Sequence, residues 1–131
     1  MNSIDHACVL FKLARSDLKA LTGMVNPELF TDAIFGFHTQ QAVEKGLKSW
    51  LVTLDVLFPT THDISRLLLL LADNGVDVAN LWEWVIFTPF AVEHRYTWPE
   101  SEDEPLDRAL IIAQVTDLLE YIQSRMLHGD W

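Results

Sequence analysis

The sequence predicts an all-α protein, an antiparallel up-and-down bundle of about five helices. Hydrophobic residues recur at spacings of three and four in successive segments, and no period-two alternation of β-branched residues persists. The five Gly and five Pro residues are expected where helices end. Half of the 131 residues are hydrophobic, which is enough for one core, so we expect a single domain over residues 1–131.

The first two helices are predicted over residues 3–22 and 30–56. Ser3 is a plausible N-cap of the first helix, and Gly23 is expected to end it. Thr31 or Asn26 is expected to cap the second helix, which would be about 40 Å long. Its expected apolar face consists of Ala33, Phe37, Val43, Leu47, Leu51 and Leu54.

Three shorter helices are predicted in the second half of the chain. One begins with Thr61 as N-cap and runs to Asp73, before an Asn-Gly stop. Another covers residues 77–92, where Pro89 is expected to kink or break its end. The last begins with Pro105 in its first turn and ends near residues 128–129.

The net charge of −10 argues against binding to nucleic-acid backbones and favours a basic partner, so RNA binding is disfavoured. The longest apolar run, residues 67–72, is too short to span a bilayer, and the N-terminus has no basic stretch typical of a signal peptide. The single Cys8 fits a reducing compartment. We therefore expect a cytoplasmic protein that does not bind membranes.

A polar stripe on the second helix is the first candidate site. His38, Gln41 and Lys45 are three and four residues apart, so they share one helix face, and Lys48 follows. Imidazole, amide and ammonium groups can all donate hydrogen bonds to a phosphate or to the edge of a nucleotide. The same pattern is also typical of a solvated helix face on which Glu44 and Lys48 form an ordinary ion pair.

Two further motifs allow a functional and a structural interpretation. His62 is a candidate general base oriented by Asp63, or a residue that packs beside a helix cap. In the Glu93-His94-Arg95-Tyr96 segment, Arg95 can clamp a carboxylate or phosphate, or it can pair with charges on the second helix. The scattered His residues and one Cys make no credible zinc set, and no glycine-rich phosphate loop is present, so no metal or cofactor is expected.

Four segments, in order, resemble the HEPN family (higher eukaryotes and prokaryotes nucleotide-binding). Residues 37–48 (FHTQQAVEKGLK) resemble its signature helix, and residues 14–21 (ARSDLKAL) its opening helix. Residues 58–64 (FPTTHDI) resemble the family's next helix start, and residues 91–96 (AVEHRY) its element before the last helix. The resemblance covers about residues 10–125.

The resemblance implies a helical bundle that usually forms a homodimer and often acts beside a minimal nucleotidyltransferase, in arrangements similar to toxin–antitoxin pairs. It also implies nucleotide binding or metal-independent endoribonuclease activity. The family's ribonucleases carry an Arg-x(4–6)-His motif, whereas here only two residues separate Arg125 from His128. The positions that match the family pattern are His38, Gln41, Lys45, His62, Glu93, Arg95 and Tyr96.

Three hypotheses follow for the function. The first is an accessory HEPN domain that binds nucleotide or a nucleotidyltransferase partner. The second is a ribonuclease toxin with a degenerate site at Arg125 and His128. The third is a non-catalytic dimerisation module. The last helix favours a dimer on sequence grounds, because Leu110, Ile111 and Ile112 together with Leu118 and Leu119 place apolar side chains on more than one side.

Overall fold

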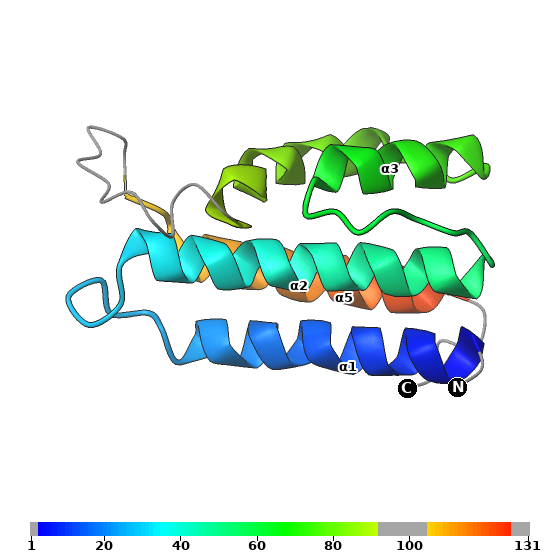
Figure 1. The fold of residues 1–131 in the computed structure, drawn as a ribbon. Coiled ribbons are helices and arrows are strands. Elements are labelled where there is room, and N and C mark those ends of the chain that lie inside the picture. The colour runs from blue at the N-terminus through cyan, green and yellow to red at the C-terminus, as the bar shows by residue number, and fades with distance from the viewer. Residues whose placement is uncertain (1–2, 92–104, 127–131) are drawn as a thin grey trace.

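A computed structural model describes residues 3–91 and 105–126, and it is an all-α bundle, as the sequence predicts (Figure 1). The structure has four α-helices and one 3₁₀ helix. The α-helices are α1 (Ser3–Thr22), α2 (Asp32–Thr53), α3 (Ile64–Asp73) and α5 (Arg108–Arg125), and the 3₁₀ helix η1 (Ala79–Ala91) lies between α3 and α5 in the chain. The described residues contain no strand.

Helix α2 lies at the centre of the bundle. Helix α1 packs along one side of α2, whereas α3 and η1 pack on the opposite side. Helix α5 runs beside α2 (Figure 1). The chain reverses direction between α1 and α2. It also doubles back after α2, so α3 points in the same direction as α2, while η1 returns in the opposite direction (Figure 1).

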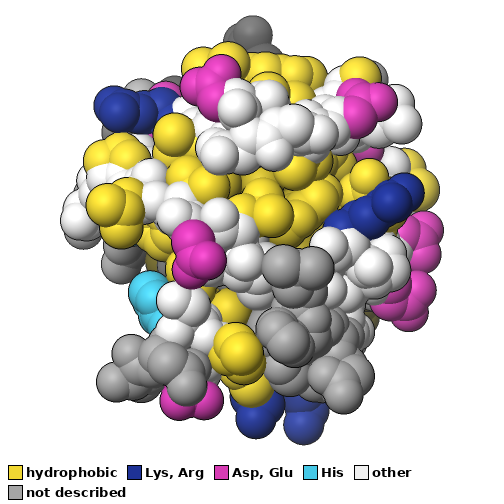
Figure 2. Space-filling view, turned by 90° about the vertical axis from the view of Figure 1, so that its right-hand side faces the viewer, with side chains coloured by type: hydrophobic (Ala, Val, Ile, Leu, Met, Phe, Trp, Pro, Cys, Tyr) yellow, Lys and Arg dark blue, Asp and Glu magenta, His cyan; other side chains and the backbone are white. Residues whose placement is uncertain are grey.

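The return after α2 depends on one unusual backbone conformation. Asp55 has a positive φ of 57°, a region that Asp tolerates better than most residues, and Ser3 donates a hydrogen bond to its carboxylate. Segment 54–63 then runs back along α2 until His62 reaches the middle of that helix, where Gln40 binds its carbonyl. The end of the bundle at which α2 stops faces the viewer in Figure 2. Hydrophobic side chains lie in the middle of this face, and charged side chains lie around them.

The prediction of one apolar face on α2 is wrong, because α2 has neighbours on several sides. Its buried residues include Phe35, Val43, Leu47 and Leu51 but also the polar residue Gln40. The glycines are also not confined to helix ends. Gly36 and Gly46 lie inside α2, where an added Cβ atom would meet the Phe90 ring and the Leu119 side chain respectively.

Helix α1 has its predicted bounds, but Ser3 is its first helical residue and not its N-cap. Of the two residues expected to cap α2, Thr31 is the N-cap, and α2 ends at Thr53. Helix α3 is capped by Asp63 and not by Thr61, whose hydroxyl instead accepts a hydrogen bond from the Asp63 amide. Residues 79–91, including Pro89, form a 3₁₀ helix.

The last helix is shorter at both ends than predicted. Its N-cap is Asp107, so Pro105 and Leu106 precede α5 instead of forming its first turn, and the helix ends at Arg125. Leu118 and Leu119 of α5 are both buried against the rest of the chain. Their burial within one protomer accounts for part of the apolar surface of α5, whereas Leu110 is 51% exposed, and dimerisation stays a prediction.

Arg108 joins the start of α5 to the segment between α1 and α2. Its guanidinium donates to the carbonyls of Met24 (2.7 Å) and Phe30 (2.6 Å) and to the Asp32 carboxylate (3.0 Å). It also lies over the Phe35 ring, 5.0 Å from the ring centroid. A buried arginine with this many acceptors fixes two chain segments that are far apart in sequence.

Within the described residues, no helix is long and apolar enough to cross a membrane.

Candidate functional site

The predicted stripe residues His38 and Lys45 meet at a carboxylate from another helix. Asp17 of α1 accepts from Nδ1 of His38 at 2.9 Å and from Nζ of Lys45 at 2.8 Å. Because a carboxylate can only accept, Nδ1 of His38 carries the proton. The Asp17 side chain is only 11% exposed, so this pairing fastens α1 to α2 at a mostly buried position.

A second buried carboxylate, Glu44, organises the other side of α2. Its Oε1 atom accepts from Nδ1 of His62 (2.8 Å) and Nε2 of Gln40 (2.9 Å), and its Oε2 atom accepts from Nζ of Lys48 (3.0 Å). The Glu44 side chain is 5% exposed. The predicted Glu44–Lys48 ion pair is therefore present, but it is buried instead of solvated. We call Gln40, Glu44, Lys48 and His62 the Glu44 cluster.

The pKa of Glu44 reports the balance of forces in this cluster. Burial alone would raise the pKa of the carboxyl group, because it penalises the charged form. Hydrogen bonds from Gln40, His62 and Lys48, together with the positive charge of Lys48, outweigh burial and lower the pKa of Glu44 below its ordinary value. Glu44 is therefore a fixed negative charge at neutral pH.

Gln41 is held by its sequence neighbour. Its Nε2 atom donates to Oε1 of Gln40 at 2.6 Å, while Nε2 of Gln40 donates to the His62 carbonyl at 3.0 Å. The amide of Gln40 is thus used fully on both sides, and it positions the backbone of His62 as well as its ring partner. His38, Gln41 and Lys45 all have partners within the chain, so a ligand at the stripe would have to displace one of them.

His62 differs from the other members of the Glu44 cluster because its side chain is 56% exposed. Glu44 accepts from Nδ1, so the proton resides on that nitrogen and Nε2 faces away from Glu44 with a free lone pair. An imidazole whose tautomer is set by a carboxylate can accept a hydrogen bond, or bind an anion once it is protonated. Neither Glu44 nor Asp17 was predicted as a site residue, because both contact partners that are distant in sequence.

Several predicted site residues lie outside the described part of the chain. These are Glu93, Arg95 and Tyr96, together with His128 of the degenerate ribonuclease motif. Arg125 is described, and its guanidinium lies 5.4 Å from the centroid of the Tyr121 ring on α5. No group of three or more His, Cys, Asp or Glu residues among those described could hold a metal ion.

The arrangement defines an all-α bundle in which two mostly buried carboxylates, Asp17 of α1 and Glu44 of the central helix α2, are each joined to one histidine and one lysine. A family model for the HEPN domain matches residues 8–124, nearly the whole chain. The chain therefore belongs to the HEPN domain family, as its motifs predict. Searches of curated proteins and of solved structures gave no significant match.

Proposed function

We propose that this protein is an accessory HEPN module that binds a nucleotide through His62 and acts in the cytoplasm beside a minimal nucleotidyltransferase, as in toxin–antitoxin-like two-component systems. Membership of the HEPN family supports a nucleotide-binding or ribonuclease-type module. Of these two, nucleotide binding suits the chain better, because only two residues separate Arg125 from His128.

The observation that carries the proposal is the exposed imidazole of His62 on a buried carboxylate. The ring is held at 2.8 Å by Glu44, while its backbone carbonyl is held by Gln40. This pre-organisation reduces the conformational entropy that a ligand must overcome on binding. Nε2 can accept from a base amino group or a ribose hydroxyl, and the protonated ring can donate to a phosphate.

Isothermal titration calorimetry with ATP and with GTP tests the proposal. We expect binding by the wild-type protein and a loss of at least tenfold in affinity for His62→Gln, which removes the imidazole but keeps a polar side chain near Glu44. His6→Gln is the matched control, because His6 is an exposed residue on α1. Absence of binding by the wild-type protein, or equal losses in the two variants, would rule out the His62 site.

The same proteins test for ribonuclease activity, both in general and at His62, which is a different position from the degenerate Arg125 and His128 site of the sequence-based alternative. A carboxylate-held imidazole is also the geometry of a general base, so purified wild-type protein should be incubated with tRNA and mRNA. We expect both RNAs to stay intact. Cleavage that His62→Gln abolishes and His6→Gln preserves would replace nucleotide binding by ribonuclease chemistry at the same residue.

The partner is tested by co-purification with the nucleotidyltransferase encoded by an adjacent reading frame. We expect a stable complex. Homodimerisation is tested on the isolated protein by sedimentation, and a monomer at micromolar concentration would contradict that part of the proposal.

A further inference from the structure

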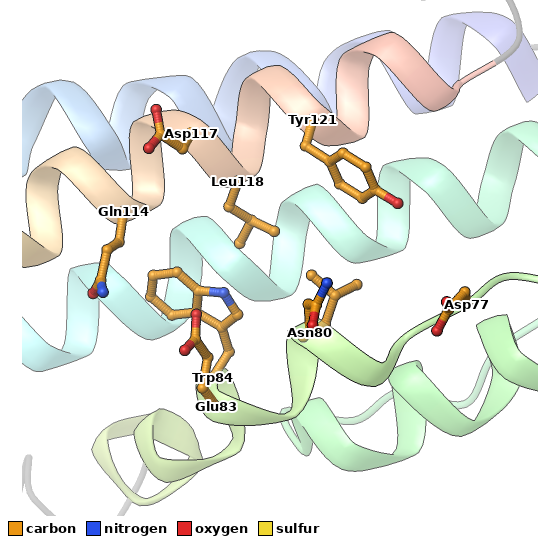
Figure 3. A pocket seen from close by; sticks show the side chains of 9 residues that line it. Asp77, Asn80, Glu83, Trp84, Gln114, Asp117, Leu118 and Tyr121 are labelled. Atoms are coloured by element: carbon orange, nitrogen blue, oxygen red, sulfur yellow. The ribbon is translucent and has the colours of Figure 1, made fainter.

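A groove between η1 and α5, here called the η1–α5 groove, contains two adjoining hollows that share Glu83, Trp84 and Gln114. The first hollow has a volume of about 320 Å³ and is shown in Figure 3. Asp77, Glu83 and Asp117 bring three carboxylates to its lining. The second hollow, of about 200 Å³, is almost entirely apolar, and its lining includes Ile86, Phe87, Leu106 and Ile111.

The three carboxylates of the first hollow have no cationic partner in the described part of the chain. The five ion pairs among the described residues all involve Asp17, Asp32 or Glu44. The only hydrogen bond on these three carboxylates among described residues is the one that Asp77 accepts from the amide of Ala79. Three like charges around one hollow repel one another, so a cation entering the hollow would be favoured.

Trp84 supplies a hydrogen-bond donor to the first hollow. The residue is 4% exposed, and its indole N–H has no hydrogen-bond acceptor within the described residues. In Figure 3 the indole nitrogen is on the side of the ring that faces the hollow, towards Leu118 and Asn80. No buried side-chain nitrogen or oxygen of the described residues lacks a partner, so this N–H is open to solvent in the hollow, and an acceptor oxygen of a ligand can take the place of water there.

We propose that the η1–α5 groove binds a basic segment of a partner protein. A Lys or Arg side chain enters the first hollow between Glu83, Asp77 and Asp117, and a peptide carbonyl oxygen accepts from Nε1 of Trp84. A neighbouring apolar side chain fills the second hollow. The proposal rests on the part of the proposed function that gives this protein a protein partner, and it does not involve His62.

The chemistry of the groove selects this occupant over others. Nucleotide phosphates would be repelled by the carboxylates. A metal ion is disfavoured because no group of described carboxylates is close enough to hold one. A small polyamine would satisfy the charges but would leave the Trp84 donor and the apolar hollow unused. A peptide with a basic and an apolar side chain satisfies all three features, and the net charge of −10 attracts such a segment.

The probe is a 14-residue amphipathic peptide with Leu at the helical spacing i, i+3, i+4, i+7 and Lys at the other positions, and its control replaces every Lys by Glu. Binding is followed by the ¹H–¹⁵N signal of the Trp84 indole, assigned by its loss in Trp84→Phe. We expect the Lys peptide to shift this signal and the Glu peptide to leave it unchanged. The affinity should fall as salt is added, because exposed charges are screened.

Matched charge variants separate the groove from the general acidity of the protein. Asp117→Asn should weaken binding by up to about fivefold and Glu83→Gln/Asp117→Asn by more than tenfold. Asp73→Asn removes the same charge from an exposed site at the end of α3 and should have little effect. His62→Gln should bind the peptide normally, so failure of the nucleotide site leaves this result unaffected.

Three outcomes would overturn the proposal. One is an unshifted Trp84 signal with the Lys peptide. Another is an equal loss of affinity for Asp117→Asn and Asp73→Asn, which would indicate attraction by net charge alone. The third is that the wild-type protein sediments as a dimer and Glu83→Gln/Asp117→Asn changes this oligomeric state. A second copy of the chain would then occupy the groove.

Discussion

Replacing Glu44 by Gln tests the Glu44 cluster with little change in side-chain shape. The carboxylate accepts three hydrogen bonds, from Gln40, His62 and Lys48, and its side chain is 5% exposed. Hydrogen bonds to a charged group contribute about 1.5–3 kcal/mol each, and Gln retains only one acceptor oxygen. The substitution also leaves the ammonium group of Lys48, whose side chain is 13% exposed, without its counter-charge. We expect Glu44→Gln to lower the free energy of unfolding at pH 7 by about 2–4 kcal/mol.

The same variant predicts a specific pH dependence. The pKa of Glu44 is lower in the folded protein than its ordinary value of 4.5, which applies to the unfolded chain. The unfolded state therefore binds more protons in this range, and the stabilisation by Glu44 is complete above about pH 4.5. It is lost as the pH falls through the lower folded pKa, by at most about 1.4 kcal/mol per pH unit.

The assay is urea unfolding followed by tryptophan fluorescence at pH 7 and at steps below pH 4.5. The difference between wild type and Glu44→Gln should shrink with acid, because a protonated Glu resembles Gln, and taking the difference cancels the other carboxylates. Glu120→Gln, at an exposed position of α5, is the control and should change stability by less than about 0.5 kcal/mol. Equal stability of wild type and Glu44→Gln at pH 7, or a difference that is independent of pH, would refute the reasoning.

Three further substitutions test the contacts that define the fold. Arg108→Met should lower the free energy of unfolding by about 3–5 kcal/mol, because it leaves the Asp32 carboxylate and two backbone carbonyls without their donor, and a urea midpoint close to wild type would contradict this. Gly36→Ala should destabilise by about 1–3 kcal/mol in thermal unfolding, since its Cβ atom would overlap the Phe90 ring; a raised melting temperature would show that the ring moves at no cost. Asp17→Asn should cost about 1–3 kcal/mol in urea unfolding, because His38 and Lys45 then lose a shared negative charge, and an unchanged midpoint would mean that solvent replaces the pairing.

Local features of the fold were predictable from the sequence. The bounds of α1 and the Thr31 cap of α2 follow from periodicity and from the N-cap preference for hydroxyl and carboxylate side chains. The prediction of Thr61 as the N-cap of α3 was wrong, because Asp63 also suits that role and only the three-dimensional path of the chain selects Asp63.

The candidate site was only partly predictable, because its essential members are paired over long distances. Periodicity identified His38 and Lys45 but gave no sign of Asp17, which lies 28 residues from Lys45. Likewise Glu44 looked like half of an ordinary surface ion pair, and only the return of segment 54–63 brings His62 onto it. The interpretation of the polar stripe as a solvated helix face was wrong for the same reason. A helix with neighbours on several sides has polar side chains that must be paired inside the bundle.

The most direct test of the proposed function is the long-range ¹H–¹⁵N spectrum of the His62 imidazole during titration with ATP. We predict that the Nε2 signal shifts on binding while the Nδ1 proton stays on the nitrogen that Glu44 holds. A protein that binds ATP with both His62 nitrogens unchanged, or that binds no ATP at all, would contradict a nucleotide site at this residue.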